Sequence, residues 1–229
     1  MDPQKPLKAA SVSYQTPDIA RQLLNMTDPM VLAGVTAAGK NAVSKKLMAR
    51  GDFERVVTNT TRPPRIKESE GKDYWFTKPD AMFDLIKRQL LVETEVIHDN
   101  VYGCSLEALL TVMRRGKRPI LTIDVNGAIN LKRIAPGIRP LFLIPPSYDE
   151  WMTRLGSRSF LSDGERQRRM HSAHLEIESA LRGNDFTIVV NNDLDQTMSE
   201  ILSGLGSDPA SQSAPRQVAQ DLFDYIKNL

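Results

Sequence analysis

The sequence contains a single cysteine, Cys104, among 229 residues, so no disulfide can form within the chain. One cysteine is typical of a protein kept in a reducing compartment. Net charge is nearly absent: 30 basic and 28 acidic residues leave +2, which provides no overall field for nucleic acid or membrane. No apolar run reaches the roughly 20 residues that a membrane-spanning helix needs, and the polar first residues contain no signal-peptide core. We therefore expect a cytoplasmic protein without a nucleic acid or membrane partner.

The remaining composition, 41% hydrophobic and 25% charged, is that of a globular protein, and the length can hold one domain or two. Short apolar runs alternate with segments of helical spacing, which indicates an α/β fold. Strands are expected at 30–33, 53–58, 90–97, 119–125, 139–144 and 185–190. Helices are expected at 17–27 (with Thr16 as the cap), 42–50, 79–88, 105–115, 148–155, 165–182, 194–202 and 215–229, and irregular segments at 1–15 and 204–215.

The stretch of residues 34–41, with the sequence GVTAAGKN, organises the rest of the chain. A run fit for a buried strand precedes it, and a helix-forming segment follows Lys40. Gly34 and Gly39 allow the backbone to curl so that successive N–H groups point into one concavity, where the helix N-terminus adds partial positive charge. Strand, glycine-flanked loop, lysine and helix together are typical of a P-loop that binds nucleotide phosphates, although the glycine pattern alone would also fit a tight turn.

A second candidate for phosphate binding lies at Arg62 and Arg65, which are three residues apart and are separated by a proline pair. Two guanidinium groups placed in this way suit a phosphate, and Tyr74 adds a phenolic donor. A solvated basic loop is the alternative, and taken alone it would be the more usual interpretation.

These motifs, taken in series, resemble guanylate kinases. The resemblance begins with the P-loop and continues, in order and at similar spacing, through 60–65 (TTRPPR), 71–76 (GKDYWF), 100–103 (NVYG), 123–127 (IDVNG), 142–147 (FLIPPS) and 190–195 (VNNDLD). It covers about residues 29–203, and several motifs in series are far more specific than one.

The resemblance implies a P-loop NTPase core with a parallel sheet flanked by helices. It also implies a small mixed-β GMP-binding lobe at 58–104 and a helical lid at 150–170, both within a domain at 29–203. Residues 1–28 would then be an N-terminal extension with a short helix, and residues 204–229 a linker with a C-terminal helix. The sequence leaves open whether that last helix folds back on the domain or mediates self-association.

The resemblance also implies roles for individual residues. On the GMP side, it assigns the phosphate to Arg62, Arg65, Tyr74 and Tyr102, the guanine edge to Glu93, and the surroundings of the base to Thr58 and Cys104. A carboxylate that accepts from N1–H and from the exocyclic amine selects guanine over adenine. Glu93 taken alone would more often be part of the polar face of a strand.

On the ATP side, the resemblance assigns the phosphates to Gly34, Thr36, Ala38, Gly39, Lys40 and Asn41, and the vicinity of adenine to Asn191. The transferred phosphoryl group would be stabilised by Lys40, Arg154, Arg158 and Arg169. The Mg²⁺ that accompanies ATP would be held by Asp124 and Asn41.

Four positions depart from the family pattern. Asn41 replaces a Ser or Thr whose hydroxyl meets Mg²⁺, and its amide oxygen is a weaker and bulkier ligand. Cys104 replaces a hydroxyl near the base, and Thr122 replaces an acid that usually precedes Ile123-Asp124. Ala37 replaces a glycine, which carries a cost only if the backbone φ angle there is positive.

The expected activity is that of a nucleoside monophosphate kinase, which transfers phosphate from ATP to GMP and yields GDP. Two alternatives stay open at this stage. The first is a catalytically weakened guanylate-kinase-like module that binds a phosphorylated or acidic partner, and the departures at Asn41, Cys104 and Thr122 favour it. The second is a kinase of the same fold with a different phosphorylated acceptor, against which Glu93 argues.

Overall fold

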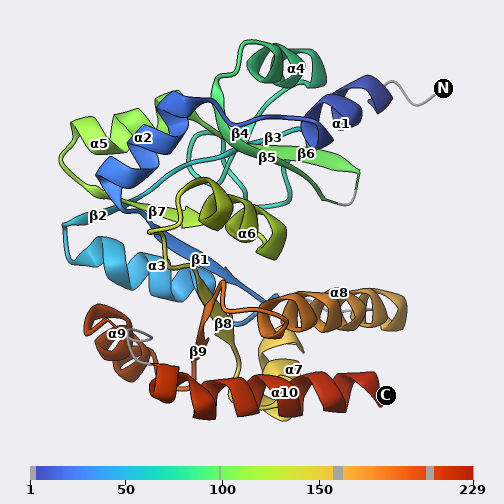
Figure 1. Cartoon of the computed structure of the whole chain (residues 1–229). Helices are drawn as coiled ribbons and strands as arrows, with labels where there is room; N and C mark the ends of the chain where they lie inside the picture. The colour runs from blue at the N-terminus through green and yellow to red at the C-terminus, as the bar shows by residue number, and fades with distance from the viewer. Residues whose placement is uncertain (1–3, 98, 157–161, 205–208, 229) are drawn as a thin grey trace. The chain divides into compact units, whose positions relative to one another are not determined.

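Parallel strands joined by helices make up most of the chain, and a small mixed sheet makes up the remainder (Figure 1). The computed structural model describes residues 4–97, 99–156, 162–204 and 209–228. By its contacts the chain divides into two units, one of residues 1–29, 51–121 and 129–138, and one of residues 30–50, 122–128 and 139–229. The parallel sheet has five strands, β1, β2, β7, β8 and β9, so the predicted α/β fold with a helix-flanked parallel sheet is confirmed.

The first unit contains the mixed sheet, whose strand order is β4-β3-β6-β5. Its strands are β3 (Asn59–Thr60), β4 (Trp75–Phe76), β5 (Leu91–Ile97) and β6 (Asn100–Ser105). The β3–β4 pair is parallel, and the β3–β6 and β5–β6 pairs are antiparallel. The same unit holds β2 (Phe53–Arg55), which pairs in parallel with β7 (Arg118–Thr122). The expected small mixed-β lobe is therefore present within the first unit.

The helices of the first unit are α1 (Lys5–Val12), α2 (Asp18–Thr27), α4 (Pro79–Lys87) and α5 (Leu106–Arg114), and α6 (Val125–Ile134) ends in it. On α4, Met82 and Ile86 lie one turn apart and form one apolar face. That face packs with Leu7 of α1 and with Leu91 and Val101 of the sheet in one buried cluster. The N-terminal helix thus belongs to the hydrophobic core of the mixed-sheet lobe.

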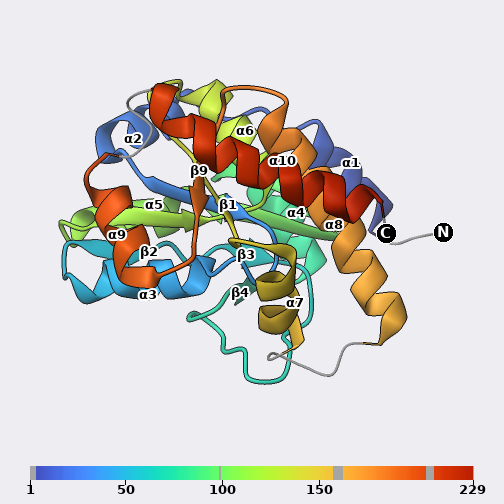
Figure 2. The ribbon, with the colours of Figure 1, turned by 90° about the horizontal axis from the view of Figure 1, so that it is seen from below.

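The second unit is built on three parallel strands, β1 (Met30–Gly34), β8 (Leu141–Ile144) and β9 (Thr187–Val190). Every residue of β1 and β8 is buried, as expected for strands that are covered on both faces. The helices are α3 (Lys40–Ala49), α7 (Tyr148–Gly156), α8 (Asp163–Leu181), α9 (Leu194–Leu202) and α10 (Ser213–Lys227), with the 3-10 turn η1 (Pro209–Gln212). Figures 1 and 2 show α10 running alongside α8. No helix within the described ranges is both long and apolar enough to cross a membrane.

The structure corrects several local predictions. Residues 1–15 were predicted to be irregular, but α1 forms there because Leu7 is buried against the lobe. The strand predicted at 53–58 ends at Arg55, because β2 and β3 belong to different sheets. Helix α6 was not predicted, because Val125, its first residue, was assigned to the strand expected at 119–125.

Two further corrections concern helix starts. Thr16 does not cap α2, whose first turn has no side-chain cap; its hydroxyl instead donates to the Val92 carbonyl at 3.0 Å. The predicted linker at 204–215 contains η1 and the start of α10, and residues 205–208 of it lie outside the described residues.

Candidate active site

The loop between β1 and α3 has the backbone shape that its glycines predict. Gly34 has a φ of +135°, and a Cβ added there would lie 2.1 Å from the Leu143 carbonyl oxygen. Gly39 has a φ of +99°, and a Cβ there would lie 2.0 Å from the Asn191 side-chain nitrogen. Both positions therefore favour glycine for two reasons, a backbone in the left-handed region and a close neighbour, which is the β8 backbone at Gly34 and the Asn191 side chain at Gly39.

Two buried side chains donate hydrogen bonds to carbonyl groups of this loop. The Trp151 indole donates to the Thr36 carbonyl at 2.7 Å, and the Asn191 amide donates to the Ala38 carbonyl at 2.8 Å. The other end of the Asn191 amide accepts from the Thr197 hydroxyl at 3.2 Å. Both ends of the Asn191 side chain are thus engaged within the protein, and its place near adenine stays a prediction. Because the loop offers only carbonyl oxygens to these two residues, neither occupies an amide group that would bind a phosphate.

Lys40 and Asp124 come together in the second unit, as a P-loop site requires. The Lys40 ammonium donates to the Gly34 carbonyl and, at 3.1 Å, to the Val35 carbonyl. One Asp124 oxygen accepts from the Gly127 amide at 2.7 Å. Burial raises the pKa of Asp124, while the Gly127 hydrogen bond and the charge of Lys40 lower it. Asp124 therefore lies within electrostatic range of the lysine.

A second carboxylate, Glu176 on α8, lies beside this pair, and the sequence analysis missed it. Burial raises the pKa of Glu176 to about 7, with Lys40 lowering it and Asp124 raising it further. Within the described part of the chain, no hydrogen bond or ion pair engages this carboxylate. The sequence pattern could have indicated a buried carboxylate here, because position 176 lies on the same helix face as the apolar residues Ala173, Ile177 and Ala180, which are buried.

Replacing Glu176 with glutamine should change how stability depends on pH. Between its ordinary pKa of 4.5 and about 7, the folded protein keeps the Glu176 proton while the unfolded chain releases it. The free energy of unfolding should therefore fall as pH rises through this window, by up to about 3 kcal/mol. The Glu176→Gln variant should lose this component and be the more stable protein at pH 8. Urea unfolding in magnesium-free buffer at pH 4.5 and pH 8 measures it.

The control for this prediction is Glu178→Gln on the same helix. Glu178 forms a surface ion pair with Arg182 at 2.9 Å, and its replacement should change the stability little. Equal pH slopes in the wild type and in Glu176→Gln would contradict the prediction.

Two of the predicted lid arginines, Arg154 and Arg169, lie on α7 and α8. Arg154 forms an ion pair with Glu150 at 2.7 Å and donates to the Asn191 carbonyl at 2.8 Å, and Arg169 forms an ion pair with Glu165 at 2.6 Å. Both pairs join acids and arginines one helical turn apart and are partly exposed, so they are weak enough to be exchanged for a phosphate. Arg158 lies outside the described residues.

On the first unit, three of the predicted acceptor residues come together although they are far apart in sequence. The Arg62 guanidinium donates to the Tyr102 hydroxyl at 3.2 Å and lies over the Tyr74 ring, 5.5 Å from its centre. The two rings pack edge to face at 5.9 Å. Arg65, in contrast, lies exposed on the loop.

The acid that orders this cluster is Glu68, which was not among the site residues predicted from the sequence. One of its oxygens accepts from Arg62 at 2.9 Å, and the other accepts from the Arg65 backbone amide at 2.7 Å. Burial disfavours the charged guanidinium, but the hydrogen bonds to Glu68 and Tyr102 outweigh it and raise the pKa of Arg62. Glu68 thus holds the side chain of one predicted phosphate ligand and the backbone of the other.

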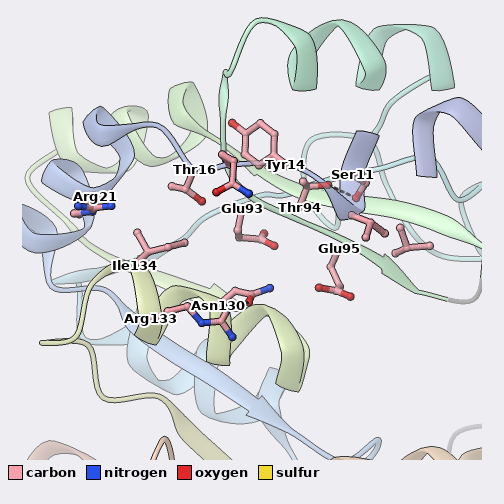
Figure 3. A pocket seen from close by; sticks show the side chains of 13 residues that line it. Ser11, Tyr14, Thr16, Arg21, Glu93, Thr94, Glu95, Asn130, Arg133 and Ile134 are labelled. Carbon is pink, nitrogen blue, oxygen red and sulfur yellow. Dashed lines mark hydrogen bonds between the residues drawn. The ribbon is translucent and has the colours of Figure 1, made fainter. Parts of the chain in front are cut away.

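Glu93 borders a cavity of about 440 Å³ in the first unit (Figure 3). Its side chain points from β5 toward α6, where Asn130 and Arg133 lie. Only 6% of Glu93 is exposed, and one of its oxygens accepts from the Cys104 amide at 3.1 Å. This carboxylate is therefore buried and fixed in direction, as an acid that reads a purine edge must be.

The other two residues predicted near the base, Thr58 and Cys104, are buried as well. Burial, and then the charge of Glu93, raise the pKa of the Cys104 thiol well above its ordinary value. The thiol therefore stays protonated at neutral pH and is not a nucleophile.

The family model for guanylate kinase matches residues 26–207, which include both groups of residues described above. The chain belongs to the guanylate kinase family. It is 31% identical over 198 residues to a guanylate kinase of Polaromonas sp., covering 86% of this chain and 95% of that one. It is 34% identical to a guanylate kinase of Neisseria gonorrhoeae, covering 75% of this chain and 83% of the relative.

A solved structure agrees with this assignment. The crystal structure of guanylate kinase from Anaplasma phagocytophilum matches with a TM-score of 0.58 and 25% identity, over 85% of this chain and 95% of that one. The family match begins at residue 26, so α1 and most of α2 precede it.

The guanylate kinase departures near the metal side can be placed in the structure. Asn41 is exposed in the first turn of α3, and the Thr122 hydroxyl is buried without a hydrogen-bond partner. The described residues contain no group of three or more His, Cys, Asp or Glu that could hold a metal alone.

The departure at Ala37 has a measurable cost, because its φ is +65°. An alanine in this left-handed region is strained by roughly 1–2 kcal/mol, part of which glycine would lose again through the entropy of the unfolded chain. The Ala37→Gly variant should therefore be more stable by about 0.5–1 kcal/mol. Ala38→Gly in the same loop is the control and should be less stable, since Ala38 is not among the residues with positive φ. Urea unfolding measures both, and a loss of stability in Ala37→Gly would contradict the prediction.

Proposed function

We propose that this protein phosphorylates GMP with ATP, forming GDP and ADP. The observation that carries the proposal is that Asp124 lies within electrostatic range of Lys40, at the end of a loop that is shaped by Gly34 and Gly39. A module that only recognised an acidic partner would have no use for these ATP-side groups. The chain has these groups, and it also has the acceptor cluster of Arg62, Tyr74 and Tyr102.

No side chain needs to act as a nucleophile in this reaction. An anionic oxygen of the GMP phosphate attacks the γ-phosphorus of ATP, a new P–O bond forms, and the bond to the β,γ-bridging oxygen breaks, with ADP leaving. The chain's contribution is positioning and charge neutralisation. Arg62, Tyr74 and Tyr102 would fix the acceptor phosphate, with Arg65 joining them from the loop.

The donor side would supply positive charge in the same way. Lys40 would move from its loop carbonyls to the outer phosphates, and Arg154 and Arg169 would exchange their neighbouring acids for the transferred group. Arg158 would contact the same group. Asp124 and Asn41 would hold the magnesium ion, which neutralises phosphate charge when ATP is bound. The uncommitted carboxylate of Glu176 and the Thr122 hydroxyl lie on this side as well.

Recognition of the base would depend on Glu93. Its carboxylate can accept from N1–H and from the 2-amino group of guanine, whereas adenine offers no donor at N1. A hydrogen-bonding site of this kind rejects an analogue that lacks the donor, because the buried acceptor is then left unpaired. The Cys104 thiol offers only a weak donor in place of a hydroxyl, so its effect should be a lower affinity for GMP.

Two other functions stay under test, the weakened binding module and a kinase for a different acceptor. The first is favoured by the unpartnered Thr122 hydroxyl, which stands where the family has an acid. ADP release should be measured with ATP and Mg²⁺ against GMP, AMP and a sugar phosphate, with calorimetry of GMP binding alongside. Turnover with GMP alone supports the proposal; binding without turnover indicates the module, and turnover with another acceptor indicates the second. The cytoplasmic location, the lack of a nucleic acid or membrane partner, and self-association through α10 stay predictions.

A further inference from the structure

Strand β5, which carries Glu93, lies at the edge of the mixed sheet, so among the described residues no strand pairs with one of its sides. Edge strands present backbone N–H and C=O groups that need other partners. Here the segment that follows α1 supplies them. The Tyr14 hydroxyl donates to the Leu91 carbonyl at 2.7 Å and accepts from the Leu91 amide at 3.2 Å. One phenol therefore takes the place of a strand partner at this residue.

The next residue along β5 is held in the same way. The Thr16 hydroxyl donates to the Val92 carbonyl at 3.0 Å. The pairing of β5 with β6 shifts register between Leu91 and Glu93, so Val92 is the extra residue of a bulge. A bulge re-aims the side chain next to it, and that side chain is Glu93.

A third contact follows directly after Glu93. The hydroxyls of Ser11 and Thr94 lie 2.8 Å apart, and both residues are buried. Residues 91, 92 and 94 are thus each bonded by a side chain of the segment 11–16. Figure 3 shows the result: Thr94 points toward Ser11, whereas Glu93 points toward α6, and all three residues line the cavity.

We propose that Tyr14 and Thr16 are positioning residues for Glu93: by fixing the bulge at Val92, they aim its carboxylate at the purine edge and so set selectivity for the guanine 2-amino group. This rests on the proposed function. Both residues precede the family match at 26–207.

The test uses variants that remove a hydroxyl and little else, Tyr14→Phe, Thr16→Val and the double variant. Steady-state kinetics with GMP are compared with kinetics for inosine monophosphate, which has N1–H but no 2-amino group. One misplaced hydrogen bond should raise the KM for GMP about fivefold, with kcat and the KM for ATP unchanged. The KM for inosine monophosphate should change far less, so the ratio of kcat/KM between the two acceptors should fall.

Two controls separate positioning from general loosening. Ser13→Ala removes a hydroxyl from the same segment that donates only to the α1 carbonyls of Ala9 and Ala10, and it should leave the ratio unchanged. Thr16→Ser keeps the hydroxyl and should restore the ratio that Thr16→Val loses. An unfolding midpoint for each variant shows that the fold is intact.

The proposal is overturned if the double variant keeps the wild-type ratio, or if the KM values for both acceptors rise equally. Failure of the proposed function would look different, because the wild type would then not turn over GMP at all. Calorimetric affinities of wild type and variants for the two nucleotides would in that case still decide whether Tyr14 and Thr16 aim Glu93.

Discussion

Replacing Lys40 with alanine should lower kcat by about 10³-fold, the upper end of the effects seen when one preorganised charge is removed from a transition state. Lys40 begins α3 directly after Gly39, and its ammonium donates to the Gly34 and Val35 carbonyls. We therefore expect it to be a positive group that reaches the outer phosphates of ATP. Single-turnover kinetics with saturating ATP and GMP measure the loss.

The control for Lys40 is Lys45→Ala, an exposed position on the same helix. It should keep kcat within about twofold, because exposed charges contribute little. Calorimetry should show GMP affinity unchanged in the Lys40 variant, since the acceptor residues are all in the other unit. A Lys40→Ala protein with near wild-type kcat would contradict the assignment of the loop.

Replacing Arg62 with alanine should lower kcat/KM for GMP by about 10²-fold or more, and leave the KM for ATP near its wild-type value. The reason is geometric: the Arg62 guanidinium bridges Glu68 and Tyr102 and lies over Tyr74, so its removal deletes a phosphate ligand and also frees both rings. Initial-rate kinetics with each substrate varied in turn measure the two effects separately.

The matched control for Arg62 is Arg88→Ala. Arg88 belongs to the same unit and forms an ion pair with Asp84 on the surface, where its side chain is 65% exposed. This variant should behave as wild type. A loss of ATP affinity in Arg62→Ala, with GMP kinetics intact, would reverse the assignment of acceptor and donor sides.

The sequence was sufficient for the parts of the site whose chemistry is local. A P-loop is continuous in the chain, so its glycines, its lysine and the flanking strand and helix could be recognised together. The Arg62, Tyr74 and Tyr102 cluster joins three segments, and only the resemblance to guanylate kinases put these residues in one site. Glu68 was not predicted because it lies in a loop, where no helical or strand periodicity marks a residue as important. Its role is evident only from its contacts with Arg62 and with the Arg65 amide.

The N-terminal segment shows a different reason for failure. Residues 5–16 have little amphipathic signal. They are held by the burial of Leu7 and by the backbone groups of an edge strand, which bond to Tyr14 and Thr16. Thr16 was expected to cap α2 because threonine before Pro17-Asp18 usually does. The competing acceptor was a carbonyl 76 residues away, which no local pattern encodes.

The single thiol of the chain, Cys104, can be used to measure local opening of the mixed-sheet lobe. Cys104 is fully buried, and it sits where β6 pairs with Glu93 of the edge strand. A maleimide can therefore reach it only when the packing around this residue opens, and the raised pKa of the thiol slows the reaction further. The rate of alkylation in the native protein thus measures how often the mixed-sheet lobe opens locally. A bound nucleotide that stabilises the closed lobe should lower this rate. The measurement uses the natural cysteine, so no label site has to be introduced.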